Sequence, residues 1–593
     1  MTLSDRVRRA LASTLARLAR EGALGDRAAG VDLAAARWSV ERPKNPEHGD
    51  LSTNAAMVLN KALGMPPRKV AEALVAGLAA EPIIGEATIA GPGFVNLRLA
   101  PAAVHAEVVE ILARGAGYGR LPSATRERVN LEFVSANPTG PLLVSHARGA
   151  IYGDAVGRLL EATGNRVTRE YYVNDFGNQV KLFAESVFAI AEGRPVPDDG
   201  YQGAYVRELA DHLRKVDSAS LFGPRDQLAR TCVTWMLRGV PGSQELRGVK
   251  ETLRQLRVDF DVWFSEESLH RWGAVGVALH QLQESGHLVE KEGATFFTIE
   301  GKGGEEDKDR VVKKSDGNYT YFASDIAYHA DKLARGYDRL INVLGADHHG
   351  YLARIRNVLE ALGLPSERFE ALLFQLVFIT RNGEVVKVGK RAGNVVTASE
   401  VMEEIDAAAG REGAGADALR FFYLLRGATS NVEFDIELAK KKSLDNPVFY
   451  VQMGHARLCS ILAKAETLGY TPADHDLSPL NDAERAVVRR LADFPGVVEA
   501  AAAAREPHKV AFWVQELATE FQSYFTQGKA DPILPPDSVR AEDGWKDRWD
   551  HRKTRARLAW VQAIRVVYAT ALGLLGVSAV ERMERPDEAE EDT

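Results

Sequence analysis

The fold of this 593-residue chain is decided by the stretch Asn130-Leu-Glu-Phe-Val-Ser-Ala-Asn-Pro-Thr-Gly-Pro-Leu-Leu-Val-Ser-His-Ala-Arg-Gly-Ala150. It opens with an apolar, strand-type run from Leu131 to Val134. The segment Asn137 to Pro141 then breaks the strand, because proline removes backbone donors and glycine permits unusual backbone angles. Apolar residues recur every four positions from Ala147 to Leu159, which predicts a helix, and Arg166 to Tyr172 predicts a second strand. Together these elements predict a β-loop-α-β unit that closes as a right-handed parallel crossover, the building block of an α/β fold.

The loop of this unit is a predicted phosphate site. A tight loop and a helix N-terminus beside the carboxyl end of a strand offer free backbone N–H groups and the positive end of the helix dipole. His146 and Arg148 lie in the first turn of the helix, and both are predicted to face the same ligand. The alternative for such a histidine is an ordinary surface residue.

Composition limits the possible classes of protein. The length suffices for several domains with large cores, and 45% hydrophobic and 26% charged residues are ordinary for a soluble protein. No run approaches 18 apolar residues, so we expect no membrane span. The N-terminus leads into an amphipathic stretch, so we expect no secretory signal. A net charge of −8 does not indicate nucleic-acid binding, but it does not exclude a local basic patch.

Two further segments carry possible chemistry. A buried strand is predicted from Arg339 to Leu344, and Gly345-Ala-Asp-His-His-Gly-Tyr351 follows at its carboxyl end, where α/β proteins bind ligands. Its aspartate and histidines could form a metal site, but no other His/Cys cluster supports one, so a nucleotide and substrate wall is preferred. The Asn382-Gly383 turn predicts a hairpin that delivers Lys387-Val-Gly-Lys-Arg-Ala-Gly-Asn394. Two lysines in such a loop can clamp a polyphosphate; the alternative is a basic surface loop.

Other parts of the chain are predicted from pattern alone. Helices are expected to fill most of Tyr205 to Leu282, and a short strand is expected from Tyr319 to Phe322. Asp325, with Ser324 before an apolar helix, is then a helix cap, a site residue or both. A basic helix is expected from Arg548 to Arg557, with its charges more often solvated than bound to phosphate.

The quoted stretch resembles the signature of the class I aminoacyl-tRNA synthetases, and specifically that of the arginyl-tRNA synthetase family. Ser135 to Leu142 and His146 to Gly149 fit the family pattern, whereas Leu143 and Ser145 replace its first His and its Gly. The lysine loop resembles the second class I signature, in which Val388 and Gly389 replace Met and Ser. Tyr171 to Gln179 and Ser315 to His329 are also family-like.

The resemblance implies a fold and a reaction. It implies an α/β, Rossmann-like class I catalytic domain with insertions at 119–437, between an N-terminal α+β domain at 1–118 that contacts the tRNA elbow and an all-α anticodon-binding domain at 438–583. Residues 584–593 form an acidic tail that is expected to be disordered. The implied enzyme is an arginine–tRNA ligase that uses L-arginine, tRNA(Arg) and ATP with Mg²⁺. It is implied to be a cytoplasmic monomer with no protein-ligated metal.

The resemblance also assigns residues. It implies that arginine is bound by Ser135, Asn137, His146, Tyr321, Asp325 and Asp347. It implies that ATP is bound by Pro138, Gly140, His146, Gly345, His348, Lys387 and Lys390. The catalytic residues are implied to be His146, Lys387 and Lys390, which stabilise the triphosphate. A planar guanidinium requires a carboxylate and aromatic walls, which fits Asp325 and Tyr321.

The departures from the signature leave an alternative open. Leu143 cannot donate a hydrogen bond to phosphate, and losing one such donor costs roughly 10²–10³ in rate. Ser145 adds a side chain where glycine lets a nucleotide approach closely. The alternative is therefore a catalytically weakened paralogue that binds tRNA or arginine; a class I nucleotidyltransferase with another acceptor conflicts with the anticodon-domain motifs. If the departures are simple losses, restoring His and Gly raises the rate.

Overall fold

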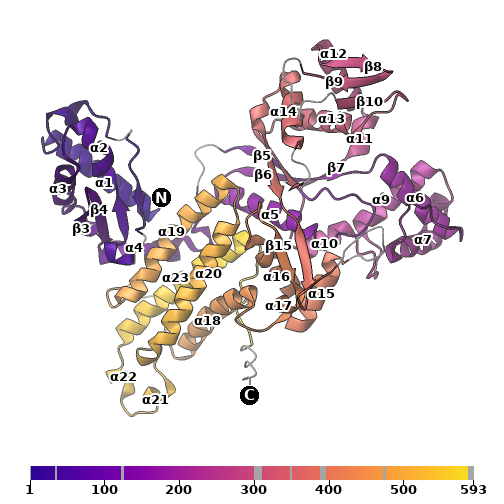
Figure 1. Cartoon of the computed structure of the whole chain (residues 1–593). Coiled ribbons are helices and arrows are strands. Elements are labelled where there is room, and N and C mark those ends of the chain that lie inside the picture. The colour runs from indigo at the N-terminus through magenta and orange to yellow at the C-terminus, as the bar shows by residue number, and fades with distance from the viewer. Residues whose placement is uncertain are drawn as a thin grey trace.

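A computed structural model of the chain describes residues 2–33, 36–43, 45–121, 126–299, 310–346, 350–386, 396–471 and 476–584 (Figure 1). Its N-terminal part has an antiparallel sheet in the order β1-β2-β4-β3, made of Val40–Glu41, Leu51–Thr53, Phe94–Leu99 and Ile84–Ala90. The helices of this part are α1 (Leu3–Arg20), α2 (Ala55–Leu63) and α3 (Pro67–Leu78). Helix α4 (Pro101–Arg114) leads out of this part and packs against the C-terminal helices.

The central part is built on a parallel sheet of five strands in the order β12-β11-β5-β6-β7. These strands are Phe369–Phe374, Arg339–Gly345, Arg128–Glu132, Arg166–Val173 and Val262–Ser265. The chain runs outward from β5 to β7 and then returns to β11 on the other side of β5. Connections therefore leave β5 and β11 in opposite directions, which opens a crevice at the carboxyl ends of these two strands.

Helices cover both faces of the parallel sheet. Val129 and Leu131 of β5 point into the main core with α5 (Ala147–Ala162), because alternate residues of a strand face opposite sides. Glu132 faces the other side, where α13 (Tyr321–Ala334) lies beside α14 (Tyr351–Ala361). The predicted β-loop-α-β unit is confirmed, with shifted ends: its first strand is Arg128–Glu132 in place of Leu131 to Val134, its helix ends three residues after Leu159, and its second strand ends one residue after Tyr172.

The insertions between β6 and β11 are mostly helical from Tyr205 to Leu282, as predicted. Helices α6 to α12 occupy Asn178–Ala191, Ala204–Val216, Ser218–Leu221, Arg225–Arg238, Val249–Gln255, Glu266–Arg271 and Ala274–Glu284. The strand β7 interrupts this predicted run of helices. A small antiparallel sheet follows, made of β8 (Leu288–Lys291), β9 (Ala294–Phe297) and β10 (Arg310–Lys313).

The predicted strand Tyr319 to Phe322 is wrong, because α13 begins at Tyr321. Tyr319 pairs only in an isolated bridge with Lys313, and the Thr320 hydroxyl donates to the Val311 carbonyl 2.7 Å away. These contacts with β10 end the extended segment and start the helix. Asp325 therefore lies inside the second turn of α13 and caps no helix.

The predicted hairpin after β12 is confirmed. Strand β13 (Val377–Arg381) pairs with β14 (Glu384–Val385) across Asn382 and Gly383, whose φ angles of 51° and 79° suit a tight hairpin turn. Strand β15 (Val432–Asp435) pairs with β13, and α15 (Ala398–Ala409) and α16 (Ala414–Leu424) complete this region.

The C-terminal part is helical, as predicted. It contains α17 to α23, which span Ile436–Lys440, Pro447–Thr467, Asp482–Ala504, His508–Gln527, Asp537–Arg540, Trp545–Arg548 and His551–Leu575. Within the described ranges, α23 alone has the length and hydropathy of a membrane span, but it packs against α18 and α20, and 67% of its most apolar window is buried.

The predicted basic helix Arg548 to Arg557 is divided between α22 and α23, and four of its five Lys and Arg side chains form ion pairs. Lys553 contacts Asp531 at 2.7 Å, and the buried Arg557 contacts Glu484 at 2.6 Å. Arg552 also pairs with Asp476. These ion pairs account for the basic sequence without any bound phosphate.

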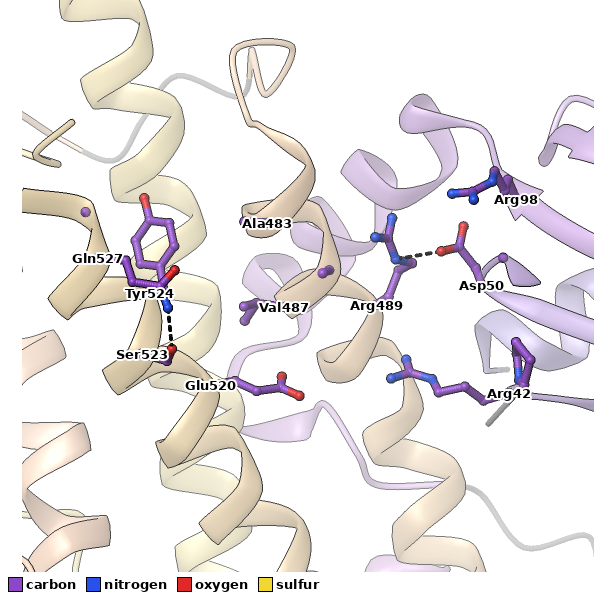
Figure 2. Close-up of a pocket in the computed structure, with 14 residues that line it drawn as sticks. Arg42, Asp50, Arg98, Ala483, Val487, Arg489, Glu520, Ser523, Tyr524 and Gln527 are labelled. Carbon is purple, nitrogen blue, oxygen red and sulfur yellow. Dashed lines mark hydrogen bonds and ion pairs between the residues drawn. The ribbon is translucent and has the colours of Figure 1, made fainter. Parts of the chain in front are cut away.

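The N-terminal part meets the helical part across a charged seam. Figure 2 shows Arg489 reaching from α19 toward Asp50 of the N-terminal part, at 2.9 Å. Arg42 pairs with Asp493 of α19 at 2.7 Å. A cavity of about 590 Å³ lies along this seam, between the N-terminal sheet and helices α19 and α20. Because its arginines are matched by carboxylates, we interpret it as an ion-paired contact between domains and not as a reaction site.

Candidate active site

Two adjoining cavities lie at the crevice between β5 and β11. The larger measures about 600 Å³ and the smaller about 230 Å³. They share four lining residues, Tyr172, Asn174, Tyr321 and Asp325. Residues that follow or end β5, β6, β11 and β12 line the larger cavity, so it occupies the position where parallel α/β sheets bind ligands.

A strained turn follows β5 and forms one wall of the larger cavity. Val134 and Ser135 have φ angles of 70° and 39°. Residues other than glycine rarely adopt this backbone conformation, which costs roughly 1–3 kcal/mol for each residue. The turn is held because Ser135 Oγ accepts from the Tyr172 backbone N–H at 3.1 Å and donates to Glu132 Oε1 at 3.2 Å. The Asn174 side chain also donates to the Ser135 carbonyl at 3.2 Å.

The crevice is strongly acidic. The pKa of Asp325 is raised to about 8, chiefly by burial and then by the carboxylates of Glu132 and Glu266. The pKa of Glu266 is raised to about 7, chiefly by burial, with Asp175 adding to the rise. Glu266 is only 2% exposed, and among the described residues its Oε2 atom has no hydrogen-bond partner. Such a site favours a cation that brings its own N–H donors.

The crevice brings together five of the residues that the sequence assigned to ligands. Ser135, Tyr321, Asp325 and Gly345 line the larger cavity, and Asn137 lines the smaller one with Tyr321 and Asp325. Tyr321 is 59% exposed and stands at the mouth. Pro138 and Gly140 lie in a buried turn packed on Tyr205 and line neither cavity. Asp347, His348, Lys387 and Lys390 lie outside the described residues.

His146 is positioned by the backbone of the altered signature. The Leu143 N–H donates to His146 Nδ1 at 3.2 Å, so a neutral His146 carries its proton on Nε2 and can donate from that atom. The Leu143 side chain is 6% exposed. The backbone around it pairs with the segment after the second signature, since Val144 N donates to Val396 O at 3.1 Å and Ala398 N donates to Leu142 O at 3.0 Å. The altered first signature is therefore held against the segment Val396 to Ala398, which follows the second signature in the sequence.

Arg148 does not face the crevice, which corrects the prediction. Its guanidinium is buried and donates to the backbone carbonyls of Gln375, Leu376, Gly427, Ala428 and Ser430. Burial without a neighbouring carboxylate lowers the pKa of Arg148 to about 10. Arg148 ties α5 to the loops that follow β12 and α16, and its role is structural.

Sequence reasoning missed several lining residues. Glu132 is a charged residue inside an apolar strand, which was the available signal for it. Glu266 was not predicted as a site residue because β7 was not predicted. It directly follows that parallel strand, at the edge of the sheet where ligands bind. Gln179 accepts from the Asn137 side chain at 2.8 Å and lines the smaller cavity. Among the described residues no cluster of three or more metal-ligating side chains occurs, and the prediction for Asp347 to His349 stays untested.

Comparison with known proteins agrees with this architecture. The family models described as arginyl tRNA synthetase N terminal domain, tRNA synthetases class I (R) catalytic domain and DALR anticodon binding domain match residues 2–99, 107–412 and 451–583. The arginine–tRNA ligase of Thioalkalivibrio sulfidiphilus (strain HL-EbGR7) is 39% identical over 620 aligned positions, which cover 98% of this chain and 100% of the relative. The chain belongs to the arginyl-tRNA synthetase family.

Solved structures of arginyl-tRNA synthetases share this fold. The Thermus thermophilus enzyme aligns with a TM-score of 0.71 at 23% identity, covering 98% of this synthetase and 100% of the other chain. The Plasmodium falciparum enzyme aligns with a TM-score of 0.70 at 14% identity, covering 98% and 99%. The fold class inferred from the sequence is therefore confirmed: an N-terminal domain, a class I catalytic domain on a parallel sheet, and an all-helical C-terminal domain.

Proposed function

We propose that this synthetase activates L-arginine with ATP and transfers it to the 3′ end of tRNA(Arg). In the first step an arginine carboxylate oxygen attacks the α-phosphate of ATP, which gives arginyl-adenylate and releases pyrophosphate. In the second step the 2′-hydroxyl of the terminal adenosine attacks the arginyl carbonyl and releases AMP. The single observation that carries the proposal is a pair of carboxylates, the half-buried Asp325 and the buried Glu266, in a crevice of the class I fold.

The guanidinium end of arginine is proposed to lie between Asp325 and Glu266. Both carboxylates line the smaller cavity, and the Glu266 Oε2 atom, which has no partner in the described part of the chain, needs a donor that a guanidinium supplies. Tyr321 provides an aromatic wall at the mouth. A neutral side chain of the same size, such as the ureido group of citrulline, offers no charge to offset the burial of these carboxylates.

The α-amino and carboxylate end is proposed to lie near Ser135 and Asn137, as the sequence resemblance implies. Glu132 joins them by geometry, because it lines the larger cavity and contacts Ser135 at 3.2 Å. Its negative charge suits the α-ammonium group. Asp347 keeps its proposed supporting role.

The triphosphate is proposed to be held by His146, Lys387 and Lys390, with Mg²⁺ arriving as part of the Mg·ATP substrate. His146 Nε2–H is a suitable donor to a phosphate oxygen as charge develops. Gly345 and His348 remain the proposed adenosine-side residues, and Pro138 and Gly140 remain proposed ATP-binding residues. The reaction needs positioning and charge stabilisation more than acid–base chemistry.

Arginine binding is expected to strengthen as pH rises from about 7 to about 9. The pKa of Asp325 in the empty crevice is about 8, so at lower pH its carboxyl group is protonated and must lose that proton to pair with a guanidinium. Glu132 and Glu266 face Asp325 and raise this pKa, while Arg354 and Lys332 lower it. The KM for arginine is therefore expected to be roughly tenfold higher near pH 7 than near pH 9. The KM for ATP serves as the control. An arginine KM that does not change between about pH 7 and about pH 9 contradicts guanidinium binding by Asp325.

The proposed substrate is tested by tRNA-dependent pyrophosphate exchange with arginine, citrulline and lysine in parallel reactions. Exchange with arginine alone is the expected result, because the crevice offers two carboxylates to a planar cation. Equal exchange with citrulline rules out recognition of the guanidinium by Asp325 and Glu266. Exchange with none of the three amino acids favours the catalytically weakened paralogue. The proposal extends to a cytoplasmic monomer, as the resemblance implies.

A further inference from the structure

A row of polar side chains crosses the three central strands on the face that α13 covers. Asn342 of β11, Glu132 of β5 and Glu170 of β6 are direct register partners, and they are 1%, 7% and 0% exposed. Helix α13 and its C-cap residue Arg335 present a matching polar stripe to this row, made of Asp325, Tyr328, His329, Lys332 and Arg335. A buried interface between a helix and a sheet is ordinarily apolar, and burying polar groups there costs desolvation free energy. We therefore expect this polar layer to serve a function.

The hydrogen bonds of this layer divide into two groups. In the first, Lys332 Nζ donates to Glu132 Oε2 at 2.6 Å and to Asn342 Oδ1 at 3.1 Å. The Asn342 amide contacts His329 Nε2 at 3.1 Å, and His329 Nδ1 contacts the Asp325 carbonyl at 2.8 Å. In the second, Glu170 accepts from Arg335 and Tyr328, at 2.6 Å in each case. The hydrogen bonds of the first group reach Glu132 and Asp325, which line the crevice, whereas the second group meets the lining only where the Tyr328 ring packs on Tyr172, with ring centroids 4.5 Å apart.

The direction of each bond in the first group is fixed by chemistry. A carbonyl oxygen can only accept, so His329 donates from Nδ1 and accepts at Nε2 from the Asn342 amide. The Asn342 oxygen is then free to accept from Lys332. The pKa of His329 is lowered to about 3, chiefly by burial and then by Lys332, so the ring is neutral at working pH. The path from Glu132 to Asp325 therefore has one arrangement of donors and acceptors.

We propose that Lys332, Asn342 and His329 are positioning residues that set the separation between Glu132 and the turn of α13 that carries Asp325. This inference rests on the proposed function, in which Glu132 binds the α-ammonium of arginine and Asp325 binds its guanidinium. The two carboxylates come from different elements, a strand and a helix, and the path through Lys332 is what joins those elements beside the crevice. It adapts the crevice to a ligand with cationic groups at both ends and the length of arginine.

The test is steady-state charging by Lys332→Met and Asn342→Leu, with arginine, ATP and tRNA varied in turn. Each variant is expected to raise the KM for arginine roughly 10- to 100-fold, because a buried polar group loses its partner and the carboxylates lose their spacing. The KM values for ATP and tRNA are expected to stay within about twofold. Preference for arginine over its homologue with one more methylene group is expected to fall.

Arg335→Met is the matched control. Arg335 lies on the same face of α13 and holds Glu170 in the same polar row, but neither residue lines the crevice. This variant is expected to lower the melting temperature while its arginine KM stays within about twofold of wild type. The inference is overturned if folded Lys332→Met or Asn342→Leu keeps the wild-type arginine KM, or if Arg335→Met raises it equally. Wild-type protein that does not charge arginine refutes the proposed function instead.

Discussion

Asp325→Asn is expected to lower kcat/KM for arginine about 10³-fold, which corresponds to roughly 4 kcal/mol of lost transition-state binding. The substitution removes the negative charge that faces the guanidinium. It also places an amide N–H donor against a cation that can only donate hydrogen bonds. Glu266, which is buried, is then the only carboxylate of the pair left to bind the guanidinium. Charging kinetics with varied arginine measure this effect.

Asp331→Asn is the control for Asp325→Asn. Asp331 lies on the same helix, pairs with Arg335 at 2.9 Å and lines neither cavity of the crevice. It undergoes the same chemical change, so its arginine kcat/KM is expected to remain within about threefold of wild type. If Asp325→Asn loses no more activity than Asp331→Asn, the guanidinium does not bind at Asp325.

His146→Ala is expected to lower kcat about 10²–10³-fold, the usual cost of one donor to a charge that develops in the transition state. The Leu143 backbone N–H donates to Nδ1, so Nε2 carries the ring proton that we propose to contact phosphate. Single-turnover formation of arginyl-tRNA at saturating arginine and ATP measures the chemical step directly.

Leu143→His is the paired variant, and it is expected to change kcat by less than about threefold. The side chain at 143 is 6% exposed, so a histidine there is directed into protein and reaches no phosphate. What positions His146 is the backbone of residue 143, which the substitution leaves in place. A kcat that rises tenfold or more in Leu143→His would instead mark the leucine as a simple loss from the signature.

The parts of the fold that local sequence determines were predictable. The break after β5 and the four-residue spacing of α5 define the first unit, and Asn382-Gly383 defines a hairpin whose positive φ angles the structure contains. These signals are local, since proline, glycine and apolar spacing act within one element. The ends of β5 and β11 could be placed at one crevice for the same reason.

The remainder depends on contacts between distant segments. Val262–Ser265 is too short to differ by pattern from its helical neighbours, and it becomes a strand by pairing with β6. Tyr319 to Phe322 has strand-forming residues, but Thr320 binds Val311 and α13 begins at the next position. Arg148 was predicted to face a ligand because its true partners could not be seen locally. The five carbonyls that bind it come from segments more than 200 residues away. Glu266 was missed together with its strand.

The proposed activity is tested most directly by charging of tRNA(Arg) with labelled arginine in the presence of Mg·ATP, beside a Lys390→Ala control. The expected result is acid-stable arginyl-tRNA that accumulates with the wild-type protein and falls at least about 10²-fold in rate in the control. Such a result establishes the synthetase and shows that Leu143 and Ser145 are tolerated. No charging by the wild-type protein, together with tight tRNA binding in a filter assay, contradicts the proposed activity and identifies a weakened paralogue.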